Sequence, residues 1–457
     1  MDKKWIPFLF LYLPIFFSFS KNAFGPYLQC PTATSIKVMW KTDLPTETVI
    51  AIGTSQGRWD SIYVFETKKK YHKVIFVNLK PNTKYYYAQF DNKKMSPNKE
   101  GEGFFNTWLA DGKNAPFSVW CIGDFGKGTN QQRAVRQSFE RYHNLNPVNF
   151  WIWLGDNAYD NGKEEEYREK VFDTYYGYDS IFKFLPFLPC PGNHDYGSVS
   201  RWGGPTKHKG PYYQLFDVYE KGEAGGVPSG TELYYSYNYG NAHFISLNSE
   251  VWAYNIFGNT AMKDWLIKDL KNNHQLFTIV YFHRPPYSKG SHDSDTFWEI
   301  FMKAMRKRFV PILEEYGVDL VLCGHTHVYE RSFLIKGLYG NSKTFDSQKH
   351  LISNSFGNTS KGDLPYVKFA NGKNANIGTI YLNCGVSGRP YDTPRFGHPI
   401  MAVEEAGPSS MGSVILDFNR EKLTTRYLKS DGSIGDEFTI IKYTKAGKQK
   451  KKKVALL

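Results

Sequence analysis

The chain has only five cysteines in 457 residues, at positions 30, 121, 190, 323 and 384. That number is too small for a disulfide framework, and no pair among them has the spacing of a thiolate metal site. Most of them lie beside strand-like runs, so we expect buried free thiols. Because the count is odd, at least one of them is unpaired in a monomer.

Long uncharged runs are as scarce as cysteines. The run from Trp5 to Ser20 follows Lys3 and Lys4, and it is shorter than the ~20 residues that a membrane-spanning helix needs. We therefore expect residues 1–20 to be a signal peptide cleaved after Ser20, with an uncleaved anchor as the alternative. This predicts a secreted protein, extracellular or in the secretory pathway (periplasmic in a bacterium), without stable membrane insertion after cleavage.

Acidic residues are in the minority: 44 Asp and Glu face 57 Lys and Arg, which gives a formal charge of +13. Part of the basic excess lies in a Lys-rich tail over residues 441–457, which includes Lys442, Lys445 and Lys448. Such a run is usually solvated, and attachment to an anionic surface is the weaker alternative. The remaining excess favours anionic substrates, and we do not expect nucleic-acid binding.

No internal repeat divides the chain, but its pattern of strands and helices changes near residue 110. Residues 24–108 contain short alternating strands separated by turns, which predicts an all-β sandwich of fibronectin type III. Leu109–Pro116 is the expected linker. In residues 117–440, strand-like runs alternate with expected helices over 130–142, 164–174, 260–272 and 294–316, which predicts an α/β domain.

Within this second domain, several apolar runs end at a glycine or at a polar side chain. The runs cover residues 117–122, 148–154, 277–282 and 318–323 and are typical of buried strands. Open α/β sheets place their sites just beyond the carboxyl ends of such strands. The motifs at these ends, and one between them, are Gly123-Asp124-Phe125-Gly126, Gly155-Asp156-Asn157-Ala158-Tyr159, Gly192-Asn193-His194-Asp195, Val280-Tyr281-Phe282-His283 and Gly324-His325-Thr326-His327.

Each motif has an ordinary interpretation when it is taken alone. Asp124 and Asp156 are common turn residues, and Asn193 suits a left-handed turn. A lone His283 after a strand is more often a satisfied core histidine. The joint occurrence of the motifs in this order is hard to assign to chance.

The most specific of these motifs contains His325 and His327. Because the two histidines stand two residues apart in a turn, their side chains can reach two different metals. Together with Asp, Asn and Tyr oxygens, imidazoles suit hard and borderline divalent or trivalent metals rather than soft ones. Two such metals a few ångströms apart can clamp a phosphate and generate a hydroxide nucleophile.

The motif set Gly-Asp-x-Gly, Gly-Asp-x-x-Tyr, Gly-Asn-His-[Asp/Glu], Val-x-x-His and Gly-His-x-His resembles that of the purple acid phosphatases, within the calcineurin-like metallophosphoesterases. The resemblance covers nearly the whole chain after residue 24. Tyr159 is the discriminating residue, because other metallophosphoesterases usually carry a ligand histidine at the position of Gly126. The implied fold is α/β (α+β): a four-layer metallophosphoesterase β-sandwich flanked by helices, with an N-terminal all-β, fibronectin type III-like domain.

The resemblance also implies the ligands of a binuclear metal site. The implied set is Asp124, Tyr159 and His327 for Fe(III), Asn193, His283 and His325 for a divalent Zn, Fe or Mn ion, and Asp156 as the bridge. A phenolate is a hard anion that favours Fe(III), and phenolate-to-iron charge transfer gives the family its colour. A metal-bound hydroxide would attack phosphorus in line while both metals stabilise the developing charge.

Two further histidines are expected at the rim of this site. His194 directly follows one implied ligand, and His292 lies a short loop after another, where the family usually has one or two substrate-facing histidines. Here the neighbour of His292 is Asp293, so one of that pair is absent. Either histidine could act as general acid or bind phosphate as a cation, so activity should peak below neutrality. Tyr287 and Arg331 are more simply explained by packing.

These residues predict a secreted acid phosphatase that hydrolyses small-molecule or protein phosphate monoesters. A phosphodiesterase or nucleotide phosphatase on the same centre is the alternative enzyme. An inactive adhesion or binding module on the same fold is the non-enzymatic alternative. Missing ligands would mark that last case, and none is missing from the sequence.

Overall fold

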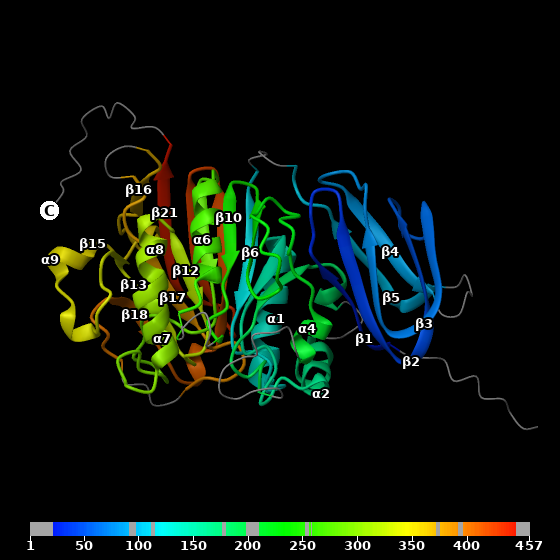
Figure 1. Cartoon of the computed structure of the whole chain (residues 1–457), viewed down its shortest axis with the longest axis horizontal. Coiled ribbons are helices and arrows are strands. Elements are labelled where there is room, and N and C mark those ends of the chain that lie inside the picture. Colours follow the sequence, from blue (N-terminus) through cyan, green and yellow to red (C-terminus); the bar gives the residue numbers. More distant parts are fainter. Residues whose placement is uncertain are drawn as a thin grey trace, which may run out of the picture.

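A computed structural model describes residues 22–90, 97–110, 115–175, 180–197, 210–251, 256, 258–371, 375–391 and 396–444 (Figure 1). The expected signal peptide, the centre of the expected linker and residues 445–457 of the basic tail lie outside these ranges. Within the described ranges, no helix combines the length and the apolar character needed to cross a membrane.

The described residues between 22 and 106 form a five-stranded antiparallel sheet. Its strands are β1 (Asn22–Gln29), β2 (Ile36–Gly53), β3 (Ser61–Phe76), β4 (Lys84–Phe90) and β5 (Pro97–Asn106). Alternate residues such as Ile36, Val38, Val74 and Phe76 are buried, as expected where one face of a sheet is covered. The all-β prediction for this region is confirmed, and its fibronectin type remains a prediction.

Polar contacts fix this N-terminal sheet against the rest of the molecule. Lys37 and Lys73 both form ion pairs with Asp217, at 2.8 and 2.7 Å. The Tyr27 hydroxyl donates to the Leu215 carbonyl at 2.6 Å. In Figure 1 the five strands accordingly stand at one end of the molecule, beside helices α2 (Glu164–Tyr167) and α4 (Pro211–Leu215).

Two seven-stranded sheets form the body of the described residues 117–443. In spatial order, the first sheet consists of β16 (Tyr366–Phe369), β21 (Ile434–Tyr443), β20 (Lys422–Lys429), β19 (Gly412–Asn419), β6 (Phe117–Ile122), β7 (Phe150–Leu154) and β8 (Phe187–Cys190). The second consists of β18 (Met401–Glu405), β13 (Tyr329–Ser332), β17 (Ile380–Cys384), β12 (Leu320–Cys323), β11 (Phe277–Tyr281), β10 (Ala242–Ser246) and β9 (Tyr235–Tyr239). Strands β6, β7 and β8 are parallel to one another, and so are β10, β11, β12 and β17. A short pair, β14 (Leu334–Ile335) and β15 (Leu351–Ser353), lies apart from both sheets.

Helices cover the outer face of each sheet, so this region has four layers. Residues such as Ile152 of the first sheet and Leu322 of the second share the core between the sheets. On the outer face of the first sheet, Trp151 packs with Phe139 of α1 (Asn130–Leu145). On that of the second, Val280 packs with α6 (Ala261–Asn272) and α8 (Val310–Glu315). The predicted fold class is therefore confirmed, and all five cysteines are free and buried as expected.

Most of the expected helices are present, but one begins later than predicted. Besides those named above, the helical segments are η1 (Arg168–Phe172), α3 (Asp173–Tyr175), η2 (Ile181–Lys183), α7 (Ile300–Ala304), η3 (Met305–Phe309), η4 (Ser342–Thr344), α9 (Ser347–His350), η5 (Thr359–Lys361) and η6 (Pro408–Ser410). The helix expected from residue 294 starts only at Ile300. Residues 293–299 form turns instead, closed by bonds such as that from the Thr296 N–H to the Asp293 carbonyl at 3.0 Å.

The last strand corrects the boundary expected for the basic tail. Strand β21 continues to Tyr443, and Lys442 lies inside it with a buried side chain. The Lys442 amine donates to both oxygens of Asp319, at 2.9 and 3.1 Å. This ion pair is why a lysine fits within the sheet, and the tail starts only after the strand.

Candidate metal centre

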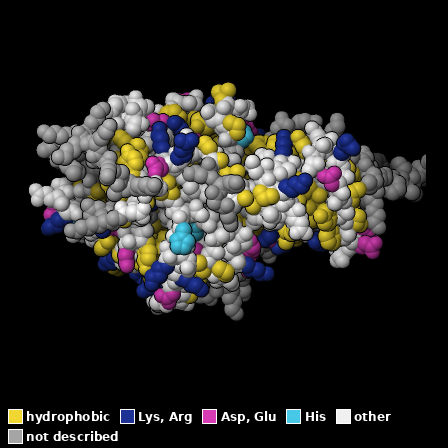
Figure 2. All heavy atoms as spheres, turned by 90° about the horizontal axis from the view of Figure 1, so that it is seen from above, with side chains coloured by type: hydrophobic (Ala, Val, Ile, Leu, Met, Phe, Trp, Pro, Cys, Tyr) yellow, Lys and Arg dark blue, Asp and Glu magenta, His cyan; other side chains and the backbone are white. Residues whose placement is uncertain are grey.

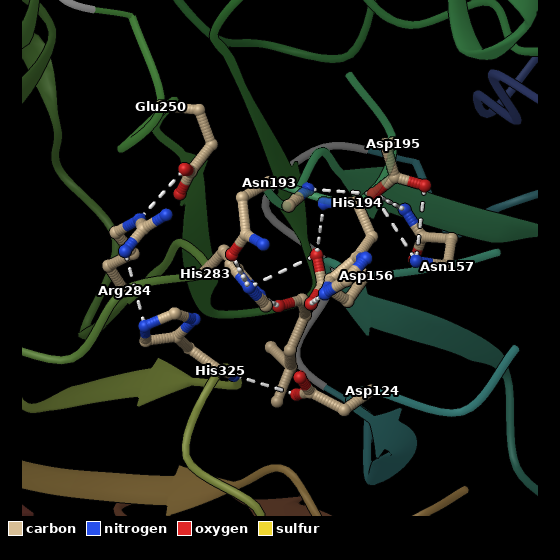
Figure 3. A network of polar contacts seen from close by, with 12 residues as sticks. Asp124, Asp156, Asn157, Asn193, His194, Asp195, Glu250, His283, Arg284 and His325 are labelled. Carbon is tan, nitrogen blue, oxygen red and sulfur yellow. Dashed lines mark hydrogen bonds and ion pairs between the residues drawn. The ribbon is translucent and has the colours of Figure 1, made fainter. Parts of the chain in front are cut away.

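Except for His292, the sequence-predicted site residues follow the carboxyl ends of parallel strands in both sheets, and Figure 3 labels most of them. In chain order they are Asp124 after β6, Asp156 and Tyr159 after β7, Asn193 and His194 after β8, His283 after β11, and His325 and His327 after β12. The first sheet thus contributes mostly oxygen donors and the second contributes imidazoles. Their mutual distances show that the two sets meet at one place.

The turns that carry these side chains bend sharply as soon as the strand ends. Asp124, Asp156 and His325 have positive φ angles of 56°, 51° and 67°. This left-handed conformation is costly for residues with a Cβ atom, and it persists only where the surroundings enforce it. Such residues cluster at functional sites, and here three predicted ligands share the feature.

The glycines of the motifs are required by close approach. A Cβ atom on Gly324 would lie 2.4 Å from Oδ2 of Asp124. A Cβ atom on Gly192 would lie 2.2 Å from the backbone nitrogen of Asp156. The loops therefore pack directly on each other's polar groups, which explains why glycine flanks the polar residues in the sequence.

Asp124, Tyr159 and His327 form one compact set, called here the tyrosine group. The Tyr159 hydroxyl donates to Oδ1 of Asp124 at 2.8 Å and lies 3.1 Å from Nε2 of His327. Nε2 of His327 lies 3.5 Å from the same Asp124 oxygen. Burial, with the charges of Asp124 and Asp156 adding to it, raises the pKa of the Tyr159 phenol well above its ordinary value. A phenolate at this position therefore requires a cation.

Asp156, Asn193, His283 and His325 form a second set, called here the histidine group. Asp156, His283 and His325 each offer one ligand atom, and these atoms lie within 4.8 Å of one another. Nε2 of His283 lies 3.2 Å from Oδ1 of Asn193 and 3.3 Å from Oδ1 of Asp156. Nδ1 of His283 donates to the Leu154 carbonyl at 2.9 Å, which leaves Nε2 free for a cation.

Asp156 belongs to the histidine group and also adjoins the tyrosine group. Burial opposes the ionisation of Asp156, but the charges of His283 and His194 outweigh it and hold its pKa below the ordinary range. The same carboxylate contributes to the raised pKa of Tyr159 in the tyrosine group. A further link between the groups runs from the His325 backbone N–H to Oδ2 of Asp124, at 2.7 Å.

His194 and His292 lie beside these groups rather than within them. Nδ1 of His194 donates to the Asp160 carbonyl at 2.6 Å, and its ring centre lies 4.4 Å from that of Tyr159. The ring of His292 stacks on His325 at 4.0 Å. Their side chains are 35% and 39% exposed, whereas those of the groups they adjoin are mostly buried. Both histidines are therefore placed to meet a substrate entering from solvent.

Asp195 is a site residue that the sequence analysis passed over, although it closes the motif Gly192-Asn193-His194-Asp195. Its fully buried carboxylate accepts from the backbone N–H of Gly192 at 2.7 Å and from the side-chain amide of Asn157 at 3.0 Å. Burial, aided by the charge of Asp156, raises the pKa of Asp195 to about 7. Asp195 ties two ligand-bearing loops together, and its place in the motif was the available signal.

Arg284, Glu250 and Glu299 form a charged cluster beside the histidine group that the sequence did not predict. Nη1 of Arg284 lies 3.2 Å from Nε2 of His325, and Nε of Arg284 donates to Glu250 at 2.8 Å (Figure 3). Glu250 follows strand β10 as the other site residues follow their strands, so a signal existed for it. Glu299 lies in the turns before α7, where a helix was expected, and had no local signal.

The structure confirms packing as the role of Tyr287 and Arg331. Tyr287 is fully buried and its hydroxyl donates to the Leu338 carbonyl. Arg331 is also fully buried and donates to Asp436 at 2.6 Å. Neither contact involves the tyrosine group or the histidine group.

Comparison with known proteins agrees with this geometry. Residues 117–329 match the family described as calcineurin-like phosphoesterase. The chain is 26% identical over 334 residues to acid phosphatase type 7 of Danio rerio, covering 65% of this chain and 68% of that protein. It is 27% identical over 289 residues to purple acid phosphatase 23 of Arabidopsis thaliana, covering 57% of each.

A solved structure shows the same fold. The purple acid phosphatase from yellow lupin (Lupinus luteus) seeds superposes with a TM-score of 0.63 at 18% identity, covering 92% of this chain and 74% of that one. Residues 117–329 thus match the calcineurin-like phosphoesterase family, and the chain is similar to purple acid phosphatases in sequence and in fold, which supports its recognition as one of them. Its class of chemistry is phosphoester hydrolysis, and that family implies a binuclear metal centre.

Proposed function

We propose that the chain is a secreted, binuclear-metal acid phosphatase that hydrolyses phosphate monoesters. The observation that carries the proposal is that the tyrosine group and the histidine group meet at Asp156. An inactive binding module on this fold would be expected to lose ligands. Every residue that the family resemblance implies as a ligand is present and lies in one of the two groups.

The donor atoms of each group fit a different metal. Asp124 and Tyr159 offer a carboxylate and a phenolate, which favour a hard trivalent ion, so the tyrosine group would hold Fe(III). Asn193 and two imidazoles carry less charge and suit Zn(II), Fe(II) or Mn(II) in the histidine group. Asp156 would bridge the two. When bound, the pair of metals would supply Lewis acidity toward the phosphate and toward an attacking water.

The chain's own residues would bind the phosphate and move the proton. His194 and His292 stand outside both groups and are partly exposed, so either can donate a proton to the leaving oxygen or bind the phosphate as a cation. The buried carboxylates Asp195 and Glu250 lie behind the ligand loops and hold them in place. Catalysis would then depend on positioning by a rigid scaffold.

Substrates and location complete the proposal. The basic excess of the chain supports small-molecule or protein phosphate monoesters as substrates, and we do not expect nucleic acid as a partner. Export along the secretory route rests on the apolar segment from Trp5 to Ser20. Sequencing the N-terminus of the protein recovered from the medium of expressing eukaryotic cells tests this part, and a chain retained with an intact residue 1 would contradict it.

The enzymatic part is tested by metal analysis, visible absorption and a substrate panel on the purified chain. We expect two metals per chain, one of them iron, a visible charge-transfer band, and faster hydrolysis of p-nitrophenyl phosphate than of bis(p-nitrophenyl) phosphate. Faster hydrolysis of the diester would favour the phosphodiesterase alternative. A chain that binds two metals and hydrolyses neither ester would support the binding module, and a chain that binds no metal would overturn the proposal.

A further inference from the structure

Glu299 lies at the centre of a polar cluster beside the histidine group, and the proposed metal ligands do not include it. Its Oε1 accepts from Nδ1 of His292 at 2.6 Å. Its Oε2 lies 3.5 Å from Nη1 of Arg284 and 3.8 Å from Nε2 of His325. The Glu299 side chain is only 13% exposed. One carboxylate therefore meets a rim histidine with one oxygen and a histidine of the proposed ligand set with the other.

Neutralising Arg284 does not account for this arrangement. Arg284 already donates to Glu250 at 2.8 Å, and the Glu250 side chain is 4% exposed. The contact between Arg284 and Glu299 is longer, at 3.5 Å. The shortest contact of Glu299 is with His292, so its placement is better explained by the histidines than by the arginine.

The two ring nitrogens of a histidine do different work, and the partner of one nitrogen decides the task of the other. With Nδ1 of His292 held by Glu299, the free nitrogen of that ring is Nε2. In His325, Nε2 lies 3.2 Å from Nη1 of Arg284 and 3.8 Å from Oε2 of Glu299. When Nε2 carries the ring proton, the carboxylate is the neighbour that can accept it, and Nδ1 is then the nitrogen left for the histidine group. Histidines that bind metals usually give their second ring nitrogen to a carboxylate or carbonyl, as His283 does with Leu154.

We propose that Glu299 is a positioning residue that orients two histidines with different tasks: His325 within the histidine group, and His292 at the substrate phosphate. The proposal rests on the proposed function, because both tasks belong to the same phosphatase site. It predicts that one carboxylate affects two separable quantities. These are the affinity for the second metal, through His325, and the turnover number, through His292.

The test uses Glu299→Ala and Glu299→Gln in the full chain, with Glu315→Gln, an exposed residue of α8, as the matched control. Affinity for Zn(II) at the second site is measured by competition with a chelator, and kcat is measured separately from KM. We expect Glu299→Ala to weaken Zn(II) binding by about 10- to 100-fold and to lower kcat by a similar factor. The Gln variant keeps one acceptor oxygen and should recover part of both, and the control should change neither.

A double-mutant cycle separates the two routes. In a His292→Ala background, Glu299→Ala should lower kcat much less than it does alone, while its effect on Zn(II) affinity should persist. If Glu299→Ala folds with unchanged Zn(II) affinity and unchanged kcat, the proposal is wrong. If only Glu299→Gln folds, wild-type Zn(II) affinity and wild-type kcat in that variant would also contradict the proposal. Metal content and activity of the wild-type chain alone test the proposed function. The role of Glu299 is tested by the ratios of Zn(II) affinity and of kcat between variant and wild type.

Discussion

The two sheets supply different atoms to the same centre. The first sheet delivers carboxylate, phenol and amide oxygens from the loops after β6, β7 and β8, whereas the second delivers imidazoles from the loops after β11 and β12. Each ligand group draws on both sheets: Tyr159 meets His327 in one, and Asn193 meets His283 in the other. Neither sheet carries a complete group, so the centre exists only when the sheets are packed together.

At the opposite ends of the strands, the first sheet supplies the cations and the second sheet supplies the carboxylate. Asp319 directly precedes β12 of the second sheet, and it pairs with Lys368 of β16 at 2.6 Å and with Lys442 of β21 at 2.9 Å, both in the first sheet. All three side chains are buried, and Lys368 also donates to backbone carbonyls, including that of Gly378 at 2.7 Å. This cluster satisfies itself within the protein, as expected of a structural ion pair. The candidate metal centre instead keeps partly exposed histidines at its rim.

The largest effect is expected from breaking the contact between the two groups. Asp156→Ala should remove the carboxylate that adjoins both, so the chain should lose both metals and its activity should fall by more than about 1,000-fold, beyond the loss of a single stabilising group. Asn193→Ala touches only the histidine group and should weaken mainly the second metal. Metal analysis and p-nitrophenyl phosphate turnover measure both variants. An Asp156→Ala chain with two metals and full activity would refute the bridging role.

The next variant removes one oxygen donor of the first sheet and leaves the imidazoles of the second in place. Tyr159→Phe should abolish the visible charge-transfer band, because no phenolate remains, and should lower kcat by about 10- to 100-fold by weakening one metal. The ring stays, so the packing of Lys127, whose amine lies 3.1 Å from the ring centre, should be kept. Absorption between 400 and 700 nm is the measurement, with circular dichroism as the check on folding. Persistence of the band would exclude Tyr159 as its source.

The positions of the candidate oxygen and nitrogen donors at the strand ends could be predicted from the sequence because their signals are local, and their binding of metals stays a prediction. A run of β-branched and aromatic residues predicts a buried strand, and a glycine with a polar side chain directly after it places that side chain at the end of the strand. Parallel strands bring such ends together at one edge of the sheet. Asp124 and His283 were found in this way. Asp195 could have been found as well, because it stands in a motif that was recognised for its other members.

What could not be predicted depends on contacts between distant segments. Glu299 is placed by turns that replace the expected helical start. Its partner His292 lies seven residues earlier in the same loop, whereas His325 comes from the loop after β12. Lys442 was assigned to a basic tail because it stands near a run of lysines, and only the pairing of β21 beside Asp319 shows it to be buried. The composition of a segment gives its charge, but it does not show whether a buried residue of opposite charge lies beside that segment in the fold.

A smaller effect on turnover is expected from a change at the rim of the site, because His292 is not among the proposed metal ligands of either sheet. His292→Ala should lower kcat by about 100-fold, in the range typical of a lost general acid, and should retain both metals. His274→Ala, an exposed histidine just beyond α6, is the matched control and should have no effect. Metal content and kcat are measured together. Loss of a metal from His292→Ala would make it a ligand, and an unchanged rate on every ester would leave it in the scaffold.

The smallest effect on turnover is expected at the opposite ends of the strands, where Asp319→Asn should change stability instead. Removing one partner of a buried ion pair leaves uncompensated charge, so we expect a loss of about 3–5 kcal/mol in the free energy of unfolding, with metal content unchanged. Burial opposes ionisation of Asp319, but Lys368 and Lys442 hold its pKa below the ordinary value. The folded pKa is thus below the unfolded one, so this contribution is full above about pH 3.9 and is lost as the pH falls through the folded pKa. The free energy of unfolding in urea at pH 7 should be lower for Asp319→Asn than for wild type, and this difference should shrink at pH 3. Asp43→Asn, at an exposed position, is the control and should match wild type at both pH values. An Asp319→Asn chain as stable as wild type at pH 7 would show that the buried cluster does not hold the two sheets together.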